Sequence, residues 1–198
     1  MFFVKILSTV KTPSLVIKWE RGAPAAKYVH KPINLLYYVD LGPNEWPWPT
    51  ELSADEFERI LNGFSDAELA KFVAGVVDGD GTVRSELRSD NIYVYVEIAV
   101  CKDCPKKFIL DVLKRVVAER FGIVGSIYSK ETTDALVFRG EGAVMLLRRV
   151  VEYIHHLLRR LRAELILALY DGRISRETFE RLYETTEYEY GGPDIKRN

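Results

Sequence analysis

The sequence of 198 residues lacks several features that define whole classes of protein. Two cysteines are too few to build a disulfide framework, so nothing points to a small secreted fold. No apolar run approaches the ~20 residues that a membrane-spanning helix needs. The first residues carry neither the basic segment nor the cleavage site of a signal peptide. These absences predict an intracellular, cytoplasmic protein without a membrane partner.

Side-chain amides are also scarce. Glutamine is absent and asparagine occurs five times, whereas 29% of the residues are charged. Proteins of thermophiles avoid heat-labile amides in this way. The composition therefore favours a thermophilic, prokaryotic source.

The chain has no excess of basic groups. It carries 28 basic and 29 acidic residues, which excludes a protein that binds nucleic acid through overall basicity. The charge is uneven, because residues 61–100 carry three basic and seven acidic groups (net −4) and residues 101–130 carry seven and three (net +4). Such asymmetry allows a local cationic surface, although solvated helix faces produce the same pattern.

The first 50 residues consist of β-rich runs separated by prolines and glycines. Runs of β-branched and aromatic residues predict strands, and the paired prolines near residue 48 stop any regular element. We therefore expect an N-terminal extension over residues 1–63, which includes a short helix, and a main domain over residues 64–198. The expected strands of the extension are Phe2–Val10, Ser14–Trp19 and Ile33–Asp40.

The main domain has clear start signals for its helices. Two capping boxes, Ser53-Ala-Asp-Glu56 and Ser65-Asp-Ala-Glu68, predict helices that end near Gly63 and at Asp78. From Ser65 the predicted order is helix, strand, strand, helix, strand, strand, helix, followed by C-terminal helices. This order indicates an α+β domain with an antiparallel sheet backed by helices on one face. The other expected elements are strands Thr82–Arg88, Ile92–Cys101, Val124–Ser129 and Ala135–Arg139, and helices Pro105–Arg120, Gly142–His156, Arg162–Tyr170 and Ser175–Tyr188.

The expected strands have two different faces. In the strand that begins at Ile92 every second residue is apolar, while Tyr93, Tyr95 and Glu97 point the other way. Helices must cover the apolar face. The polar, tyrosine-bearing face is left open, either as an ordinary solvated surface or as a binding platform.

The nonapeptide Val73-Ala-Gly-Val-Val-Asp-Gly-Asp-Gly81 ends the second capped helix and leads into a strand. Gly75 and Gly79 are four residues apart, so they share a helix face and leave a flat stripe on which another backbone can pack closely. Phe72 and Val76 supply apolar area beside this stripe. The pattern predicts a close helix–helix contact.

Two carboxylates stand at the end of the motif helix. Asp78 and Asp80 are expected where the last carbonyls are unpaired and the helix dipole is negative, which is unfavourable without a compensating cation. A divalent cation held by the Asp80 carboxylate and the Gly79 carbonyl would compensate them. Mg²⁺ suits such a sparse site, because it keeps several waters. The alternative is an ordinary helix C-cap followed by a turn.

Taken whole, the nonapeptide resembles the signature of the LAGLIDADG homing endonucleases. Five positions are identical, three exchange one aliphatic residue for another, and Gly79 replaces an alanine. The capped helix before the motif and the polar-faced strand pair after it add to the resemblance, which covers about residues 65–170. It implies the αββαββα fold of that family, with a saddle-shaped antiparallel sheet.

The resemblance implies an intron- or intein-encoded nuclease that hydrolyses both strands of DNA at a specific site with Mg²⁺ or Mn²⁺. A single motif is typical of members that act as homodimers on near-palindromic DNA. Asp80 and the Gly79 carbonyl would hold the metal, and the motif helices would pack together through Phe72, Gly75, Val76 and Gly79. The residues implied for contacts with double-stranded DNA are Arg84, Glu86, Arg88, Tyr93, Tyr95, Glu97, Ser126, Tyr128, Lys130 and Arg139.

The basic residue that assists catalysis departs from the family pattern. The family usually places a lysine near the scissile phosphates, whereas the corresponding stretch here carries Arg159 and Arg160. Arginine stabilises charge but does not lose a proton at useful pH. The polar residue that helps to hold the attacking water would fall near Lys102.

Two other functions remain open. A LAGLIDADG relative that no longer cleaves would act as an RNA splicing factor or a nucleic-acid-binding regulator, but a pure binder has no need for the Asp80 carboxylate. If the motif is accidental, the chain is an α+β interaction protein whose glycine stripe serves dimerisation.

Two smaller signals receive structural interpretations. Cys101 and Cys104 form a lone CxxC pair, which is not a zinc site without a second pair. Plain packing of the thiols is favoured over a disulfide, although a disulfide would suit a hyperthermophile. His155 and His156 are expected on a leucine-rich helix in a structural role.

Overall fold

The computed structural model describes residues 14–19, 33–38, 52–88 and 91–186, and the chain divides into two compact units. The first unit consists of Met1–Glu51 and Thr185–Asn198. In it β1 (Ser14–Trp19) pairs antiparallel with β2 (Ile33–Tyr38), which confirms two of the strands expected there. The expected strand Phe2–Val10 lies outside the described residues.

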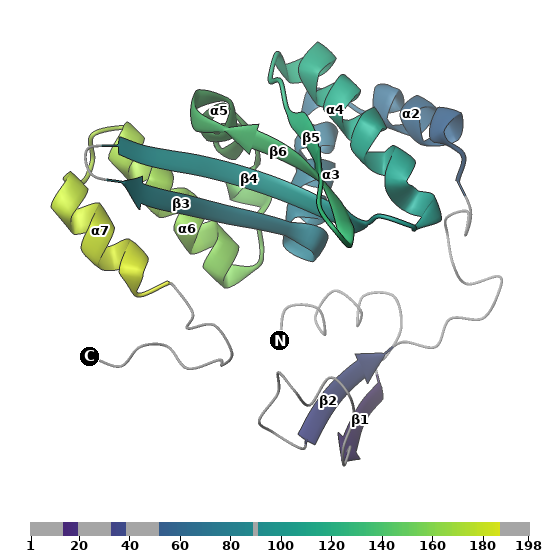
Figure 1. Cartoon of the computed structure of the whole chain (residues 1–198), viewed down its shortest axis with the longest axis horizontal. Helices are drawn as coiled ribbons and strands as arrows, with labels where there is room; N and C mark the ends of the chain where they lie inside the picture. Colours follow the sequence, from purple (N-terminus) through teal and green to yellow (C-terminus); the bar gives the residue numbers. More distant parts are fainter. Residues whose placement is uncertain (1–13, 20–32, 39–51, 89–90, 187–198) are drawn as a thin grey trace. The chain divides into compact units, whose positions relative to one another are not determined.

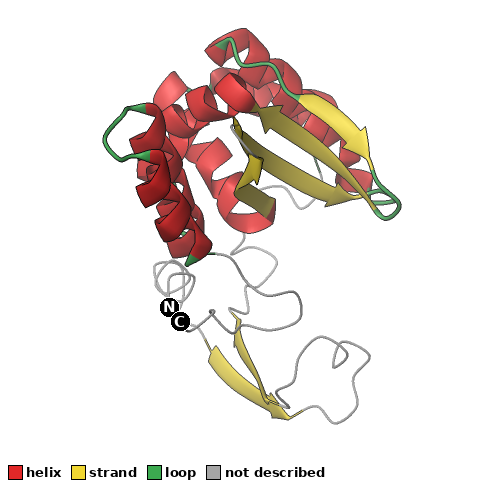
Figure 2. Ribbon diagram, turned by 60° about the vertical axis from the view of Figure 1, so that its left-hand side comes forward, coloured by secondary structure: helices red, strands yellow, loops and turns green. Residues whose placement is uncertain are grey.

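The second unit, Leu52–Glu184, is an α+β structure in which helices gather on one side of a four-stranded sheet (Figures 1 and 2). The sheet is antiparallel throughout and has the strand order β3-β4-β6-β5. The expected fold class and the helix–strand order from Ser65 are therefore confirmed. The elements are α2 (Ala54–Gly63), α3 (Asp66–Asp80), β3 (Gly81–Arg88), β4 (Asn91–Cys101), η2 (Pro105–Lys107), α4 (Phe108–Phe121), β5 (Ser126–Ser129), β6 (Thr133–Arg139), α5 (Gly140–Val150), η3 (Val151–Tyr153), α6 (Leu157–Tyr170) and α7 (Arg176–Glu184).

Both capping boxes form as predicted. Ser53 accepts a hydrogen bond from the Glu56 amide, and the Glu56 side chain accepts one from the Ser53 amide. Ser65 and Glu68 make the same reciprocal pair at the start of α3. These pairs satisfy amides that the first helical turn leaves without partners.

The core lies between the apolar face of the sheet and the helices. On the inner face of β4, Val94, Val96 and Ile98 are buried, as the period-two pattern predicted. Helix α2 contributes Phe57 and Leu61 to this core, although the sequence placed it in the N-terminal extension. The helical side chains buried against the sheet include Leu69, Val73, Val77, Leu113, Val116 and Leu147.

The structure corrects the boundary between α5 and α6. Helix Gly142–His156 was expected, but α5 ends at Val150, a 3-10 turn follows, and α6 begins at Leu157 rather than at Arg162. His155 and His156 lie in the break between them, and the His156 side chain caps α6 by accepting from the Arg159 amide at 3.4 Å. The break arises from contacts with α3, described below.

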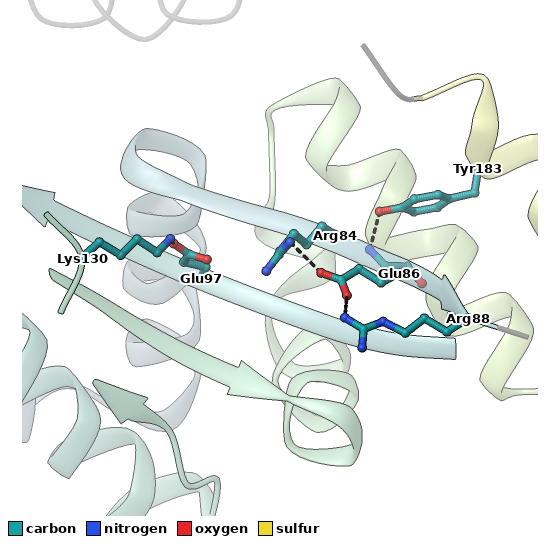
Figure 3. A network of polar contacts seen from close by, with 7 residues as sticks. Arg84, Glu86, Arg88, Glu97, Lys130 and Tyr183 are labelled. Carbon is teal, nitrogen blue, oxygen red and sulfur yellow. Dashed lines mark hydrogen bonds and ion pairs between the residues drawn. The ribbon is translucent and has the colours of Figure 1, made fainter. Parts of the chain in front are cut away.

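The edge of the sheet at β3 is covered by the C-terminal helices. The Ser85 amide donates to the hydroxyl oxygen of Tyr183 on α7 at 2.6 Å (Figure 3). Arg162 on α6 donates to the Val83 carbonyl at 3.4 Å. Tyr183 also stacks on Phe179, with ring centroids 5.1 Å apart. Helix α7 therefore holds β3 by a buried hydrogen bond and apolar packing.

Cys101 and Cys104 are joined by a disulfide across the turn that follows β4, with Cα atoms 5.3 Å apart. Plain packing of two thiols was favoured from the sequence, and this was wrong. The short separation in the chain places both cysteines in one turn, which brings their Cα atoms into the range that a disulfide can bridge.

Within the described residues, no helix combines the length and apolar character needed to cross a membrane.

Candidate functional site

The motif helix α3 presents its glycines on an open surface. Gly75 and Gly79 are exposed, and a Cβ atom placed on either would meet no atom within 4 Å. Phe72 and Val76 beside them are partly buried against the core. The stripe expected from the sequence is therefore accessible in the single chain.

Gly81, the last residue of the motif, is needed for a different reason. It begins β3 directly after α3, and a Cβ atom on it would lie 2.5 Å from the Cα atom of Val77. No other residue fits this approach without moving the backbone. The close contact fixes Asp80 at the junction of α3 and β3.

Asp78 joins α3 to α6. Its carboxylate is buried and accepts hydrogen bonds from the backbone amides of His155 at 2.7 Å and His156 at 3.1 Å. These amides precede α6, where the helix dipole favours a negative charge. Asp78 therefore lies in the last turn of α3, as expected, and its carboxylate is compensated by backbone amides rather than by a cation.

Arg159 brings a positive charge to the same place. Its Nη1 donates to the backbone carbonyl of Asp78. Burial lowers the pKa of the Arg159 guanidinium, and the nearby carboxylates of Asp78 and Asp80 oppose this effect. Arg160 points along α6 instead, where its Nε donates to Glu164 at 2.8 Å. Of these two arginines, Arg159 is the one beside the motif.

Asp80 is exposed at this junction, unlike Asp78. Among the described residues, no three His, Cys, Asp or Glu side chains cluster closely enough to form a complete metal site. The Asp80 carboxylate and the Gly79 carbonyl supply two oxygen donors at the end of α3. Such a set fits a hard cation that takes its other ligands from water, from phosphate or from a second chain.

The outer face of the sheet carries arginine and tyrosine side chains in register. On β3, Glu86 binds Arg84 at 2.9 Å and Arg88 at 2.8 Å (Figure 3). The Arg84 guanidinium lies over the Tyr95 ring at 4.6 Å, and that of Arg88 lies over Tyr93 at 5.3 Å. The hydrogen bond to Glu86 raises the pKa of Arg88, so this guanidinium stays charged.

The second strand pair extends this face. Arg139 lies over Tyr128 at 4.3 Å and over Tyr95 at 5.8 Å. Lys130 binds Glu97 at 2.5 Å (Figure 3). Exposed Ser126 on β5 lies on the same face. Four basic and two acidic side chains expected to contact DNA thus lie on one surface, which has a net charge of +2.

Lys102 lies beyond the end of β4. Its Nζ is 3.4 Å from the Lys130 carbonyl, and its amide donates to the Thr132 carbonyl. These contacts place it in the loop at the end of the sheet. Its expected role beside the attacking water stays a prediction.

Sequence reasoning missed two features of the site. The amides of His155 and His156 bind Asp78, and backbone amides carry no signal in residue type. The stacking of arginines on tyrosines was also missed, but the alternation of both residue types on strands expected to pair could have revealed it.

Together these elements define an α+β protein whose four-stranded antiparallel sheet bears helices on one face and interleaved arginines and tyrosines on the other. Solved structures with a similar fold include two of the homing endonuclease I-CvuI in complex with DNA targets. One is 16% identical, covers 61% of this chain and 76% of that chain, and has a TM-score of 0.45. The other is 17% identical, covers 67% and 87%, and has a TM-score of 0.47.

The LAGLIDADG meganuclease I-AabMI bound to uncleaved DNA is also similar, at 17% identity over 59% of this chain and 43% of that chain, with a TM-score of 0.42. No family model matches the sequence. No curated protein sequence matches it. These identities and TM-scores are low, so the function of this chain has to be derived from its own residues.

Proposed function

We propose that this protein is a metal-dependent, site-specific endonuclease of the homing type, which cuts both strands of DNA as a homodimer. The observation that carries the proposal is the contrast between two acids of one motif. Asp78 is buried and bound by two backbone amides, whereas Asp80 is exposed beside the open glycine stripe. Asp78 already joins α3 to the start of α6, so the fold does not need the carboxylate of Asp80.

The residues of the site fit phosphodiester hydrolysis. Asp80 and the Gly79 carbonyl would hold Mg²⁺ or Mn²⁺, and such a metal supplies an activated water and stabilises the attacking and leaving oxygens. Arg159 stabilises the negative charge of the phosphate in the transition state and does not act as a base. The outer face of the sheet orients the duplex through its arginines, Lys130 and tyrosines.

The same geometry supports a homodimer. One chain provides one Asp80, whereas cleavage of two strands needs two sites. Packing of Gly75 and Gly79 against the same stripe of a second chain would bring both Asp80 carboxylates to a common axis. The DNA site of such a dimer is near-palindromic.

The test is cleavage of a supercoiled plasmid library carrying random inserts, with Mg²⁺ and with EDTA. The wild-type chain is expected to linearise a subset of plasmids with Mg²⁺ alone. Asp80→Asn keeps the shape but removes the charge that holds the metal, so cleavage should fall by at least about a thousandfold. Asp111→Asn, an exposed carboxylate on α4, is the matched control and should cleave normally.

Binding separates a nuclease from a non-cleaving relative. Asp80→Asn should bind the cleaved sequence as tightly as the wild type or more tightly, because it no longer repels phosphate. Loss of binding together with cleavage would give Asp80 a structural role instead. A wild-type chain that binds but never cleaves would support the splicing factor or regulator.

A further inference from the structure

Strand β3 carries a three-residue ionic network on the outer face of the sheet. Arg84, Glu86 and Arg88 alternate along the strand, so their side chains share one face. Glu86 Oε1 accepts from Arg84 Nη1 at 2.9 Å, and Oε2 accepts from Arg88 Nη2 at 2.8 Å (Figure 3). One carboxylate thus holds two guanidiniums.

Tyrosines of the neighbouring strand fix the planes of these guanidiniums. Arg84 stands directly opposite Tyr95, and Glu86 stands opposite Tyr93. Each arginine lies over one ring, at 4.6 and 5.3 Å from the centroids. A guanidinium that is stacked and hydrogen-bonded has lost most of its rotamer freedom before it meets a ligand, so binding costs less ordering entropy.

The network also sets the spacing of the two cations. Residues four apart on a strand are about 13 Å apart along the backbone, which corresponds to about four base pairs. The ends of the two side chains are closer together than their backbone positions, because both guanidiniums bind the carboxylate of Glu86. The guanidiniums therefore lie within about two base-pair steps of each other, at ~3.4 Å per step. Each still has unused N–H donors, because arginine carries five and the contact with Glu86 uses one.

We propose that Arg84 and Arg88 read two guanines on adjacent or next-adjacent base pairs in the major groove, and that Glu86 is the residue that positions them. The inference rests on the proposed function, since it assigns part of the target site of the same face. A two-stranded ribbon fits the major groove, and the arginine fork matches the O6 and N7 acceptors of guanine.

Glu86 contributes specificity at the expense of affinity. Its charge repels phosphates and restrains both arginines, which would otherwise bind any nearby phosphate. Removal of this charge should therefore strengthen binding to unrelated DNA and weaken the preference for guanine. A merely structural role would not produce opposite changes in these two measurements.

The experiment is selection from a pool of random 40-base-pair duplexes in EDTA, with sequencing of the bound fraction. The full-length wild-type chain should enrich a motif with two guanines no more than two base pairs apart. Arg84→Gln and Arg88→Gln should each lower the preference at one of these positions about tenfold or more. Arg149→Gln removes the same charge from α5, where Arg149 lies over Phe121, and should leave the motif unchanged.

Two further measurements test the mechanism. Glu86→Gln should lower the preference at both positions and raise the affinity for a scrambled duplex. Replacing either guanine by 7-deazaguanine, which lacks the N7 acceptor, should weaken wild-type binding and should not weaken binding of the matching arginine variant.

The outcomes distinguish this inference from the proposed function. Enrichment of a motif without the guanine pair by the wild-type chain would overturn the recognition of guanines by β3, and so would a guanine pair that survives Arg84→Gln and Arg88→Gln. In either case the protein would still be a site-specific DNA-binding protein. Enrichment of no motif at all would overturn both.

Discussion

At the scale of single residues, Asp78 and Asp80 show how surroundings decide the role of a side chain. They are two residues apart and chemically identical, yet Asp78 is buried on two amides and Asp80 is exposed. A buried carboxylate needs such donors to offset its desolvation. The exposed one is the acid that the proposed function assigns to the metal.

Arg159 and Arg160 should differ in the same way. Arg159→Gln removes the cation beside Asp80, so cleavage of the selected DNA is expected to fall about a hundredfold or more, with affinity for that DNA little changed. Arg160→Gln removes an exposed pair with Glu164 and should cleave within a few-fold of the wild type. Single-turnover cleavage and gel-shift affinity measure both effects. Equal losses in the two variants would remove Arg159 from the catalytic site.

The buried acid Asp134 should govern stability at low pH. The ion pair with Lys107 at 2.7 Å, with a smaller contribution from the Ser129 side chain, lowers the pKa of Asp134. Its contribution to the free energy of unfolding is therefore present above its ordinary pKa of 3.8 and is lost as the pH falls through its lower pKa in the folded state. The same contact with Asp134 raises the pKa of Lys107. Its contribution to the free energy of unfolding is therefore complete below pH 10.5 and is lost only above that pH, as Lys107 loses its proton in the folded state.

We expect Asp134→Asn to have a lower Tm than the wild type at pH 7, with a difference that shrinks below pH 3.8. Thermal unfolding across this range is the measurement. A difference that is the same at pH 3 and pH 7 would show that the carboxylate charge contributes nothing.

At the scale of elements, the glycine stripe of α3 allows a test of the dimer that leaves the monomer intact. A side chain at Gly75 meets no atom within 4 Å in the single chain, and leucine favours a helix over glycine by about 1 kcal/mol. Gly75→Leu should therefore still fold, but form a monomer that does not cleave both strands.

Sedimentation equilibrium of Gly75→Leu beside Lys114→Leu checks this prediction. Lys114→Leu adds the same side chain to an exposed position of α4 and should remain dimeric. A Gly75→Leu chain that is dimeric and active would place the interface elsewhere.

The sequence predicted those elements whose signals are local. Ser53 and Ser65 cap helices because a hydroxyl and a glutamate three residues later are enough, and the inner face of β4 follows from alternation. The break between α5 and α6 was not predictable. It depends on hydrogen bonds from His155 and His156 to Asp78, which is 77 residues earlier than His155.

The candidate site was likewise predicted in part. The motif pointed to Asp80 and Gly79 through residue type and spacing. It could not separate Arg159 from Arg160, because their difference depends on the direction of each side chain from α6. Nor could it show that Glu86 binds both neighbouring arginines.

At the scale of the whole molecule, the net charge of −1 conceals a cationic surface on the outer face of the sheet. Affinity for DNA should therefore depend steeply on salt, with a slope of log K against log salt steeper than about −2. The double variant Lys130→Gln/Arg139→Gln should reduce the magnitude of this slope by about 1.8 if both groups contact phosphate. Fluorescence anisotropy over a salt series measures the slope. An unchanged slope in the double variant would show that Lys130 and Arg139 do not contact phosphate.

The buried hydrogen bond between Ser85 and Tyr183 has a consequence for aggregation. A strand at the edge of a sheet offers its free amides and carbonyls to strands of other molecules, and this is a route to aggregation. Tyr183 occupies the Ser85 amide and Arg162 occupies the Val83 carbonyl, so α6 and α7 shield the β3 edge. A chain shortened to end before Arg176 would keep α3, α6 and the whole four-stranded sheet, yet it would uncover the Ser85 amide at this edge and is expected to join its copies strand to strand.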